Sequence, residues 1–367
     1  MIGCDYMKIA IIGAGASGLA LAGLLADRHE VYVFERLDRP GRKLLASGNG
    51  RCNMSNLNMN ENFYNHKGFV KKLYDDIPKD KVYDFFDKLG ILTKADNEGR
   101  IYPYSNSSQT VLDALLNKCK NVCFNYNYLV KSIKFNNKWF INDFKPGFDH
   151  LFITSGSIAG MEKSKQDGVY SYLDFLKFTK LSPALCGFRL KENVKAISGV
   201  RVKALVKLLK NDKEIYAEAG EVIFKDDGIS GIVIMNVEEI YLENYEKNAN
   251  FKISLDFCPD FSLNDLKKYQ LEGILPLKLA RYLKHFSDTK NLEFNIYLPY
   301  DYNNAQVING GISLDMVNDN LEYINNKTLH FAGEVLDING RCGGYNLHFA
   351  FASALKNFEV LNNENKN

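Results

Sequence analysis

The first residues whose spacing suits a chemical role are the glycines of the segment Gly13-Ala14-Gly15-Ala16-Ser17-Gly18. If this segment joins a strand to a helix, Gly13 permits the tight turn, Gly15 lets the backbone approach a pyrophosphate, and Gly18 lets helix and strand pack closely. The pyrophosphate would accept hydrogen bonds from N–H groups at the positive end of the helix. Glu35 ends the next expected strand, where its carboxylate can accept hydrogen bonds from ribose hydroxyls. The pattern predicts a dinucleotide site made by Gly13, Gly15, Ala16, Ser17, Gly18 and Glu35, the alternative being a tight turn without a ligand.

A second group follows in the stretch from Gly41 to Asn53. Arg42 and Lys43 place cationic side chains shortly after the ribose-binding strand, where they could meet a pyrophosphate. The run from Ala46 to Asn53 is dense in backbone donors and small residues, so it can lie flat against a large planar ring; the alternative is a mobile surface loop. Cys52 could be a redox thiol, but no cysteine pairs with it in sequence, which favours a packing role. The candidates here are Gly48, Asn49, Gly50, Arg51, Cys52 and Asn53.

A third group lies near the end of the chain, from Phe331 to Asp337 and from Gly340 to Asn346. An acidic residue after a strand, Glu334, could bind ribitol hydroxyls, and a helix opened by a Gly-Gly turn could stabilise negative charge on a reduced flavin ring. The alternative is a surface helix with an N-cap. No general acid or base can be assigned. The nearest candidates by sequence position are Tyr345, His348 and Arg51, and for His348 a packed or solvated helix position is favoured.

The elements that would position these residues begin with a β-α-β unit. Residues 8–13 form a short apolar run, 16–26 a small apolar helix, and 30–35 a second strand, so the two strands should be parallel. A long loop without structure of its own is expected from Arg36 to about Asn62. Helices are expected at 67–76, 79–89 and 107–119, and strands at 122–126, 129–135, 138–142 and 149–153.

From about Ala184 the pattern changes to short alternating runs. Antiparallel strands are expected within 185–190, 200–209, 221–227, 231–237 and 251–257, followed by helices at 262–269 and 273–286. Residues 328–351 then return to a strand, a glycine-rich turn and a helix.

The composition is that of an ordinary globular protein, with 46% hydrophobic and 25% charged residues in 367. A net charge of +2 gives no argument for nucleic-acid binding, which would need a basic face or stripe. The seven cysteines are irregularly spaced and contain no CxxC pair, so we expect no metal site and free thiols in a reducing cytoplasm. We expect neither a signal peptide nor a membrane span, and Met7 is an alternative to Met1 as the start.

Two long strings, GRKLLASGNGRCNMSN at 41–56 and GEVLDINGRCGGYNLHFA at 333–350, resemble a bacterial flavoprotein family. Its members are labelled NAD(P)/FAD-dependent oxidoreductase, BaiN-type reductase or aminoacetone-oxidase-family FAD-binding enzyme. Weaker similarity occurs at 98–105, 151–156, 182–188, 227–231 and 309–314. The resemblance implies an α/β fold: a Rossmann-type FAD-binding domain built from both chain ends, with an inserted β-barrel-like domain and a small helical segment. The expected boundaries are 1–183 and 311–367 for the FAD-binding domain and 184–310 for the insert.

The resemblance also implies which residues contact FAD. Beyond the candidates above it adds Arg36, Val130 through its backbone, and the turn at Ser155 and Gly156, where the family usually has a Thr-Gly-Gly sequence. At the other end it implies Gly333, Glu334, Asp337, Gly343, Gly344, Tyr345 and Asn346. The chain departs from the family at 225–232, which lacks the usual Thr, His and Pro, and at Arg341 and Cys342, which replace an aromatic residue and Thr. The FAD site is therefore expected, whereas the substrate does not follow from the resemblance.

Together these features predict an FAD-dependent oxidoreductase that moves hydride between flavin and a small organic substrate or NAD(P)H. Only one dinucleotide motif is present, so NAD(P)H would dock transiently at the flavin, or be unnecessary if oxygen is the acceptor. One alternative is a non-catalytic or redox-sensing FAD-binding protein. Another is an NAD-dependent dehydrogenase, which would be colourless when purified. The oligomeric state does not follow from the sequence.

Overall fold

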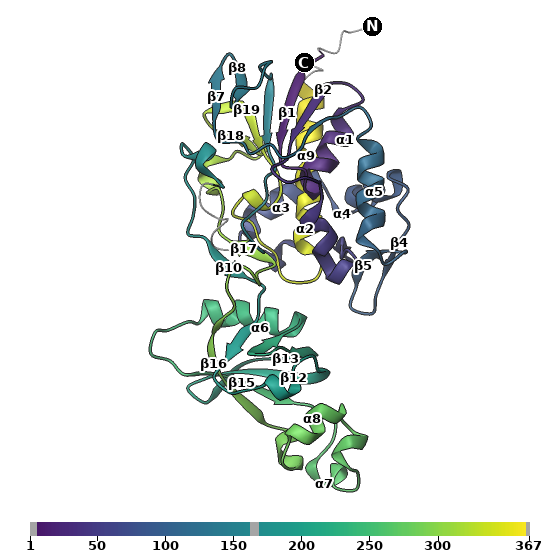
Figure 1. The fold of residues 1–367 in the computed structure, drawn as a ribbon, viewed down its shortest axis with the longest axis vertical. Coiled ribbons are helices and arrows are strands. Elements are labelled where there is room, and N and C mark those ends of the chain that lie inside the picture. Colours follow the sequence, from purple (N-terminus) through teal and green to yellow (C-terminus); the bar gives the residue numbers. More distant parts are fainter. Residues whose placement is uncertain (1–5, 162–168, 365–367) are drawn as a thin grey trace. The chain divides into compact units, whose positions relative to one another are not determined.

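A computed structural model describes residues 6–161 and 169–364, and it divides the chain into two compact units (Figure 1). The first unit combines residues 1–182 with 308–367, and the second unit comprises residues 183–307.

The first unit is organised around a six-stranded sheet in the order β18-β19-β9-β1-β2-β6. Its central pairs, β1 with β2 and with β9, are parallel, as the β-α-β pattern predicted. β19, from the end of the chain, pairs in parallel with β9. The predicted Rossmann-type domain built from both chain ends is therefore confirmed. The strands are β1 (Lys8–Ile12), β2 (Glu30–Phe34), β6 (Cys123–Asn125), β9 (His150–Ile153), β18 (Glu322–Tyr323) and β19 (Asn326–Phe331).

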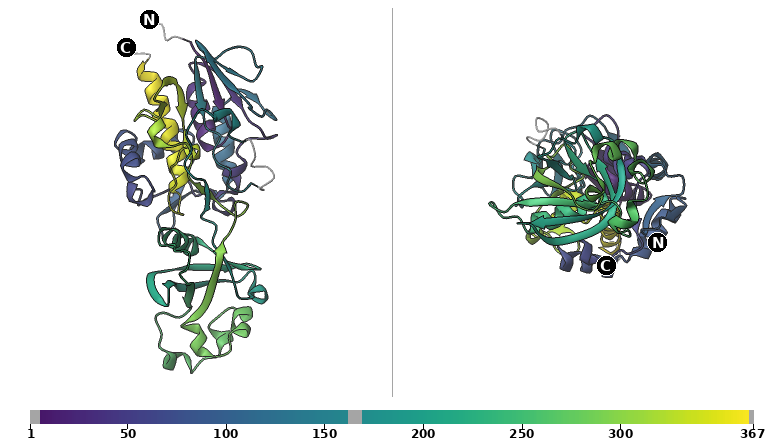
Figure 2. Two further views of the ribbon diagram at one scale, coloured as in Figure 1. Left: turned by 90° about the vertical axis from the view of Figure 1, so that its left-hand side faces the viewer. Right: turned by 90° about the horizontal axis from the view of Figure 1, so that it is seen from below.

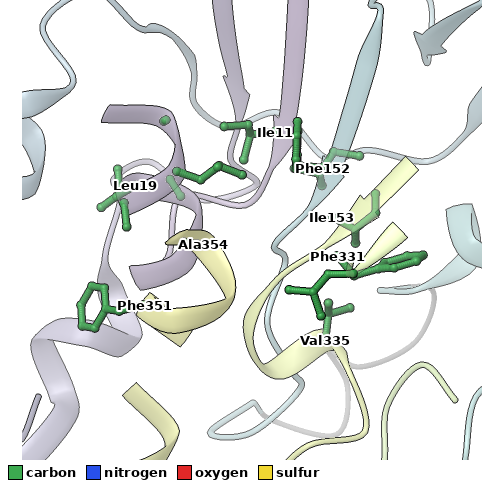
Figure 3. Packing of buried hydrophobic residues seen from close by; sticks show 14 of the residues in the cluster. Ile11, Leu19, Phe152, Ile153, Phe331, Val335, Phe351 and Ala354 are labelled. Atoms are coloured by element: carbon green, nitrogen blue, oxygen red, sulfur yellow. The ribbon is translucent and has the colours of Figure 1, made fainter. Parts of the chain in front are cut away.

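Helices α1 (Ala16–Leu25) and α9 (Tyr345–Glu364) pack side by side against this sheet (Figures 1 and 2). The small residues of α1 allow close packing, since a Cβ on Gly23 would stand 2.8 Å from the side chain of Lys118 in the neighbouring helix α5 (Ser108–Lys118). Figure 3 shows the resulting core, in which Leu19 and Phe351 lie on the helix side and Phe331 on the strand side, all fully buried.

The remaining helices of the first unit, α3 (Lys67–Asp76) and α4 (Lys79–Lys88), also match their predicted ranges within one residue. The prediction of a structureless loop over 36–62 was wrong, because this stretch contains helix α2 (Arg42–Ala46) and strand β3 (Ser55–Asn56). β3 pairs with β5 (Arg100–Pro103), which pairs with β4 (Thr93–Ala95).

The predicted strand at 129–135 was wrong for its first half. Strand β7 covers Ile133–Asn136 and forms a hairpin with β8 (Lys138–Ile141). The N–H groups of Lys131 and Ser132 instead donate to the Asn142 side chain at 2.8 and 3.0 Å. A side-chain acceptor therefore satisfies the amides that a strand ladder would have used.

The second unit contains a closed six-stranded barrel in which every neighbouring pair is antiparallel. This confirms the expected barrel-like insert. Its strands are β11 (Phe188–Leu190), β12 (Arg201–Lys210), β13 (Lys213–Phe224), β14 (Gly228–Ser230), β15 (Phe251–Asp256) and β16 (Leu292–Pro299). A short pair, β10 (Ser182–Ala184) with β17 (Val307–Asn309), connects the chain segments that enter and leave it.

One predicted strand of this unit is a helix. Residues 231–237 were expected to be extended, but α6 covers Ile232–Glu243 and packs on β12 and β13. The β-branched run buries Val233 and Val237 on the helix face, so packing against the barrel outweighs the strand propensity of these residues. The later helices are shorter than predicted: α7 covers Leu263–Leu266 and α8 covers Leu277–Tyr282.

Within the described ranges, no helix combines the length and the apolar character that crossing a membrane would require. In the same part of the chain, no group of three His, Cys, Asp or Glu side chains is arranged to hold a metal ion.

Candidate cofactor site

The turn between β1 and α1 leaves open space at one glycine and none at the other two. Gly13 has a φ of +107°, and a Cβ there would stand 2.6 Å from the Thr154 carbonyl oxygen. A Cβ on Gly18 would stand 2.0 Å from the Gly13 carbonyl oxygen, whereas one on Gly15 would meet nothing within 4 Å. The first N–H groups of α1, including those of Ala16 and Ser17, have no acceptor inside the helix. The turn thus offers unfilled space in front of hydrogen-bond donors.

Glu35 is held at the edge of this space. Its carboxylate accepts the N–H of Ala14 at 2.8 Å and the N–H of Leu37 at 2.9 Å. These two amides fix the orientation of the carboxylate beside the start of α1. Its other lone pairs can still accept hydrogen bonds from hydroxyl groups.

A pocket lined by Gly13 and Glu35 also includes residues that follow β6 and residues that follow β9. Val130 lines it, and neither the N–H nor the C=O of Val130 has a hydrogen-bond partner among the described residues. Tyr172, whose pKa burial raises to about 12, donates to the Ser155 hydroxyl at 3.0 Å in the pocket wall. Sequence reasoning missed seven of the lining residues, among them Tyr128 and Leu129, which directly precede Val130, and Tyr172.

Three cationic side chains, Arg36, Arg42 and Lys43, follow Glu35 in the sequence and belong to the candidate site. Arg36 and Arg42 have no carboxylate partner in the part of the chain that the structure describes. Lys43 places Nζ 2.5 Å from a carboxylate oxygen of Glu334, whose second oxygen accepts the Ser157 hydroxyl at 2.7 Å. Residues from the two chain ends therefore meet in one ion pair.

The loop after α2 adopts left-handed backbone at four of its residues: Gly48, Asn49, Gly50 and Cys52. The Cys52 thiol is completely buried, and burial raises its pKa to about 11, so this side chain packs rather than acting as a thiolate. The Arg51 guanidinium lies 4.8 Å from the centre of the Tyr102 ring and its Nε donates to the Gly48 carbonyl at 3.3 Å.

The turn before α9 packs directly on residues that follow this loop. Asn56 donates through Nδ2 to the Gly343 carbonyl at 3.0 Å, and a Cβ on Gly344 would stand 2.2 Å from the Ser55 carbonyl oxygen. Gly344 also donates its N–H to the Asn53 side chain at 3.1 Å.

The structure places the other predicted residues of this end as follows. Gly333 has a φ of +74° and donates its N–H to the Ser353 hydroxyl. A Cβ on Gly333 would stand 2.7 Å from the Ser17 hydroxyl oxygen, so there is no room for a side chain. Asp337 lies 3.3 Å from the His66 ring nitrogen. The Tyr345 ring packs on Phe63, Asn346 hydrogen-bonds both backbone groups of Gly340, and Tyr170 donates to the Gly156 carbonyl.

His348 lies in the interior behind this turn. Its ring is completely buried, and burial lowers its pKa to about 3. It is therefore a packed helix residue and not an exposed acid or base, which is the interpretation that the sequence favoured.

Comparisons with known proteins find relatives over almost the whole chain. The chain is 27% identical to the 3-dehydro-bile acid delta(4,6)-reductase of Clostridium scindens, covering 94% of this chain and 97% of the relative. It is 25% identical to the ribosomal RNA dihydrouridine synthase of Escherichia coli, covering 94% and 95%. The crystal structure of 3-ketosteroid-delta4-(5alpha)-dehydrogenase from Rhodococcus jostii RHA1 has the same fold, with a TM-score of 0.52 at 11% identity over 98% and 97% of the two chains. The model of the family described as HI0933-like protein Rossmann domain matches residues 7–357, and the chain belongs to that family.

Proposed function

We propose that this protein is an FAD-dependent oxidoreductase. The observation that carries the proposal is that residues from both chain ends meet beside one pocket: Glu35 and Ser157 line it, and Ser157 hydrogen-bonds both members of the Lys43–Glu334 pair. The space that a Cβ on Gly15 would fill, in front of α1, suits a pyrophosphate. FAD bound there would supply the hydride chemistry of its ring.

The residues have separate roles in this proposal. The amides at the start of α1 and the side chains of Arg36, Arg42 and Lys43 bind the diphosphate, and Glu35 binds the ribose. Val130 offers its unpartnered backbone groups to the adenine edge. Residues 48–53 and 343–346 lie beside the ring, and Ser155, Gly156, Gly333, Glu334 and Asp337 beside the ribitol and the phosphates.

The names of two relatives suggest a substrate class. A bile acid with a 3-oxo group and double bonds at positions 4 and 6, and a uridine that becomes dihydrouridine, both carry a C=C bond conjugated with a carbonyl group. We propose that this chain reduces such a bond in a small molecule. NAD(P)H would dock transiently as the donor, because the chain has one dinucleotide motif.

The name of the second relative, a ribosomal RNA dihydrouridine synthase, also suggests RNA as the substrate. A net charge of +2 gives little support to phosphate-backbone binding, which relies on clustered Lys and Arg. We therefore favour a small molecule and keep RNA as an outcome of the test. We also propose a cytoplasmic location, because the six described cysteines are not in disulfide bonds.

The test begins with the visible spectrum of the purified protein and continues with anaerobic titration by NADH and NADPH. We expect flavin bands that bleach with at least one nicotinamide and return when 2-cyclohexenone is added, with cyclohexanone as the matched inert control. Reoxidation by a uridine-containing RNA but not by the enone would favour the RNA substrate. Bound flavin that neither nicotinamide reduces would favour a non-catalytic or substrate-driven role. Protein that neither contains FAD nor can be reconstituted with it would contradict the whole proposal.

A further inference from the structure

Ser55 and His348 form a buried hydrogen-bonded pair behind the Gly343–Gly344 turn. The Ser55 hydroxyl lies 2.8 Å from Nδ1 of His348, and both side chains are completely buried. The half-buried Tyr83 ring packs edge-on to His348, with the ring centres 6.3 Å apart, and burial raises the pKa of its phenol. The Tyr83 O–H donates to the Asn56 carbonyl at 2.9 Å.

The direction of these bonds follows from the second ring nitrogen of His348. Nε2 is buried and has no hydrogen-bond partner among the described residues. A buried N–H without an acceptor is rarer in proteins than an acceptor without a donor, so the proton sits on Nδ1. His348 then donates to Ser55, while Tyr83 separately donates to the Asn56 carbonyl.

Both hydrogen bonds involve residues that hold the Gly343–Gly344 turn in place, namely Ser55 and Asn56. Asn56 donates its side-chain N–H to the Gly343 carbonyl at 3.0 Å. The Ser55 carbonyl lies so close to Gly344 that a Cβ there would be 2.2 Å away. His348 itself is one helical turn into α9, and its N–H donates to the Gly344 carbonyl at 3.0 Å. A shift of Ser55 must therefore move the turn and the start of α9.

We propose that His348 is a positioning residue for the flavin: through Ser55 it holds the Gly343–Gly344 turn, and with it the N-terminus of α9, where that helix stabilises negative charge on the reduced ring. The inference rests on the proposed function, because it requires FAD in the site. α9 has 20 residues, and the N–H groups at its start carry partial positive charge. Displacing them disfavours the reduced flavin more than the oxidised flavin.

The experiment measures the two-electron midpoint potential of the FAD-loaded protein by anaerobic equilibration with a redox dye. Ser55→Ala and His348→Phe should each lower the ratio of reduced to oxidised flavin about tenfold at a fixed potential, a shift of about 30 mV. The double variant should shift no further than either single one, because all three remove the same bond. His348→Asn, whose amide can stand where Nδ1 stood, should restore most of the wild-type potential.

Asn357→Leu is the matched control on the same helix. Asn357 is fully buried and donates to the Phe331 carbonyl at 2.9 Å, so this variant should lower the thermal midpoint and leave the flavin potential unchanged. If Ser55→Ala and His348→Phe fail to fold, Tyr83→Phe at its half-buried position should give a smaller shift in the same direction. Potentials equal to wild type in the folded variants, or an equal shift in Asn357→Leu, would overturn the inference. Wild-type protein that does not bind FAD would instead contradict the proposed function.

Discussion

The turn before α1 and the turn before α9 have similar compositions but are shaped by different parts of the chain. At the first turn, Gly13 and Gly18 are confined by each other and by Thr154 at the end of the adjacent strand β9. At the second turn, Gly343 and Gly344 are confined by Asn56 and Ser55, almost 290 residues earlier in sequence. The first shape follows from the β-α-β unit together with Thr154 after β9. The second needs a remote loop, so it can be disturbed without touching α9.

Substitution at the second turn should have the largest effect on folding. Gly344→Ala combines a φ of +98° with a Cβ 2.2 Å from a backbone oxygen, which has no flexible end that could move away. We expect the free energy of unfolding to fall on the order of 3 kcal/mol. Urea denaturation measures this free energy of unfolding. A loss below about 1 kcal/mol would mean that the Gly343–Gly344 turn and the Ser55–Asn56 segment separate easily.

Acid should also destabilise the fold, through His348 behind the second turn and through His150 on β9. The pKa of His348 is lowered to about 3 and that of His150, 2.9 Å from the His330 ring, to about 4, in both cases mainly by burial. Below the ordinary value of 6.5 the unfolded chain binds protons that the folded chain excludes. Each such histidine should lower the free energy of unfolding by about 1.4 kcal/mol per pH unit as pH falls from 6.5 toward 4.

Denaturation at several pH values measures this slope. His348→Asn should reduce this slope by the contribution of one proton. An unchanged slope in His348→Asn would contradict the assignment.

At the first turn, Gly15→Ala should separate folding from cofactor binding. The backbone of Gly15 has a φ of −84°, which alanine adopts, and its Cβ would meet nothing within 4 Å. We expect the free energy of unfolding without FAD to change by less than about 0.5 kcal/mol. The affinity for FAD should fall at least about tenfold, or 1.4 kcal/mol, because the methyl group occupies the space for the pyrophosphate. Flavin fluorescence titration measures this affinity. An unchanged affinity would mean that the phosphates of FAD bind elsewhere.

The smallest effect is expected where the two chain ends meet in an ion pair. Lys43→Met leaves Glu334 without its cation, but the lysine side chain is 47% exposed. The loss of stability should stay below about 1 kcal/mol. FAD affinity should fall several-fold, and less at high ionic strength if Lys43 acts through its charge. Lys71→Met, which breaks an exposed pair within α3, is the matched control.

The sequence predicted the first unit better than the second, for a physical reason. α3, α4 and α5 carry helical periodicity, α1 is apolar over its whole length, and the limits of all four were predicted within one or two residues. In the barrel, short apolar runs suit a strand and a helix equally, which is why α6 was predicted as a strand.

The first half of β13 was missed because its alternation exposes most of its side chains. The Asn211–Asp212 turn, with φ of 51° and 62°, was the signal that could have identified this hairpin.

In the candidate site too, local features could be predicted from the sequence and long-range contacts could not. Gly13, Gly15, Gly18 and Glu35 could be inferred because a local motif fixes their neighbours. The contacts of Lys43 with Glu334 and of Ser55 with His348 join residues about 290 positions apart. A single sequence holds no distance information of that kind, so the residues could be named but not their partners.

The position of β19 in the sheet also has a consequence for biosynthesis. β9 is complete by residue 153, but its partner β19 begins at residue 326 and α9 at residue 345. While the ribosome translates the intervening stretch, the apolar edge Leu151–Ile153 has no strand beside it, which exposes a segment prone to intermolecular pairing. We therefore expect the nascent chain to depend on chaperones until about residue 350 emerges, and flavin to load only after synthesis.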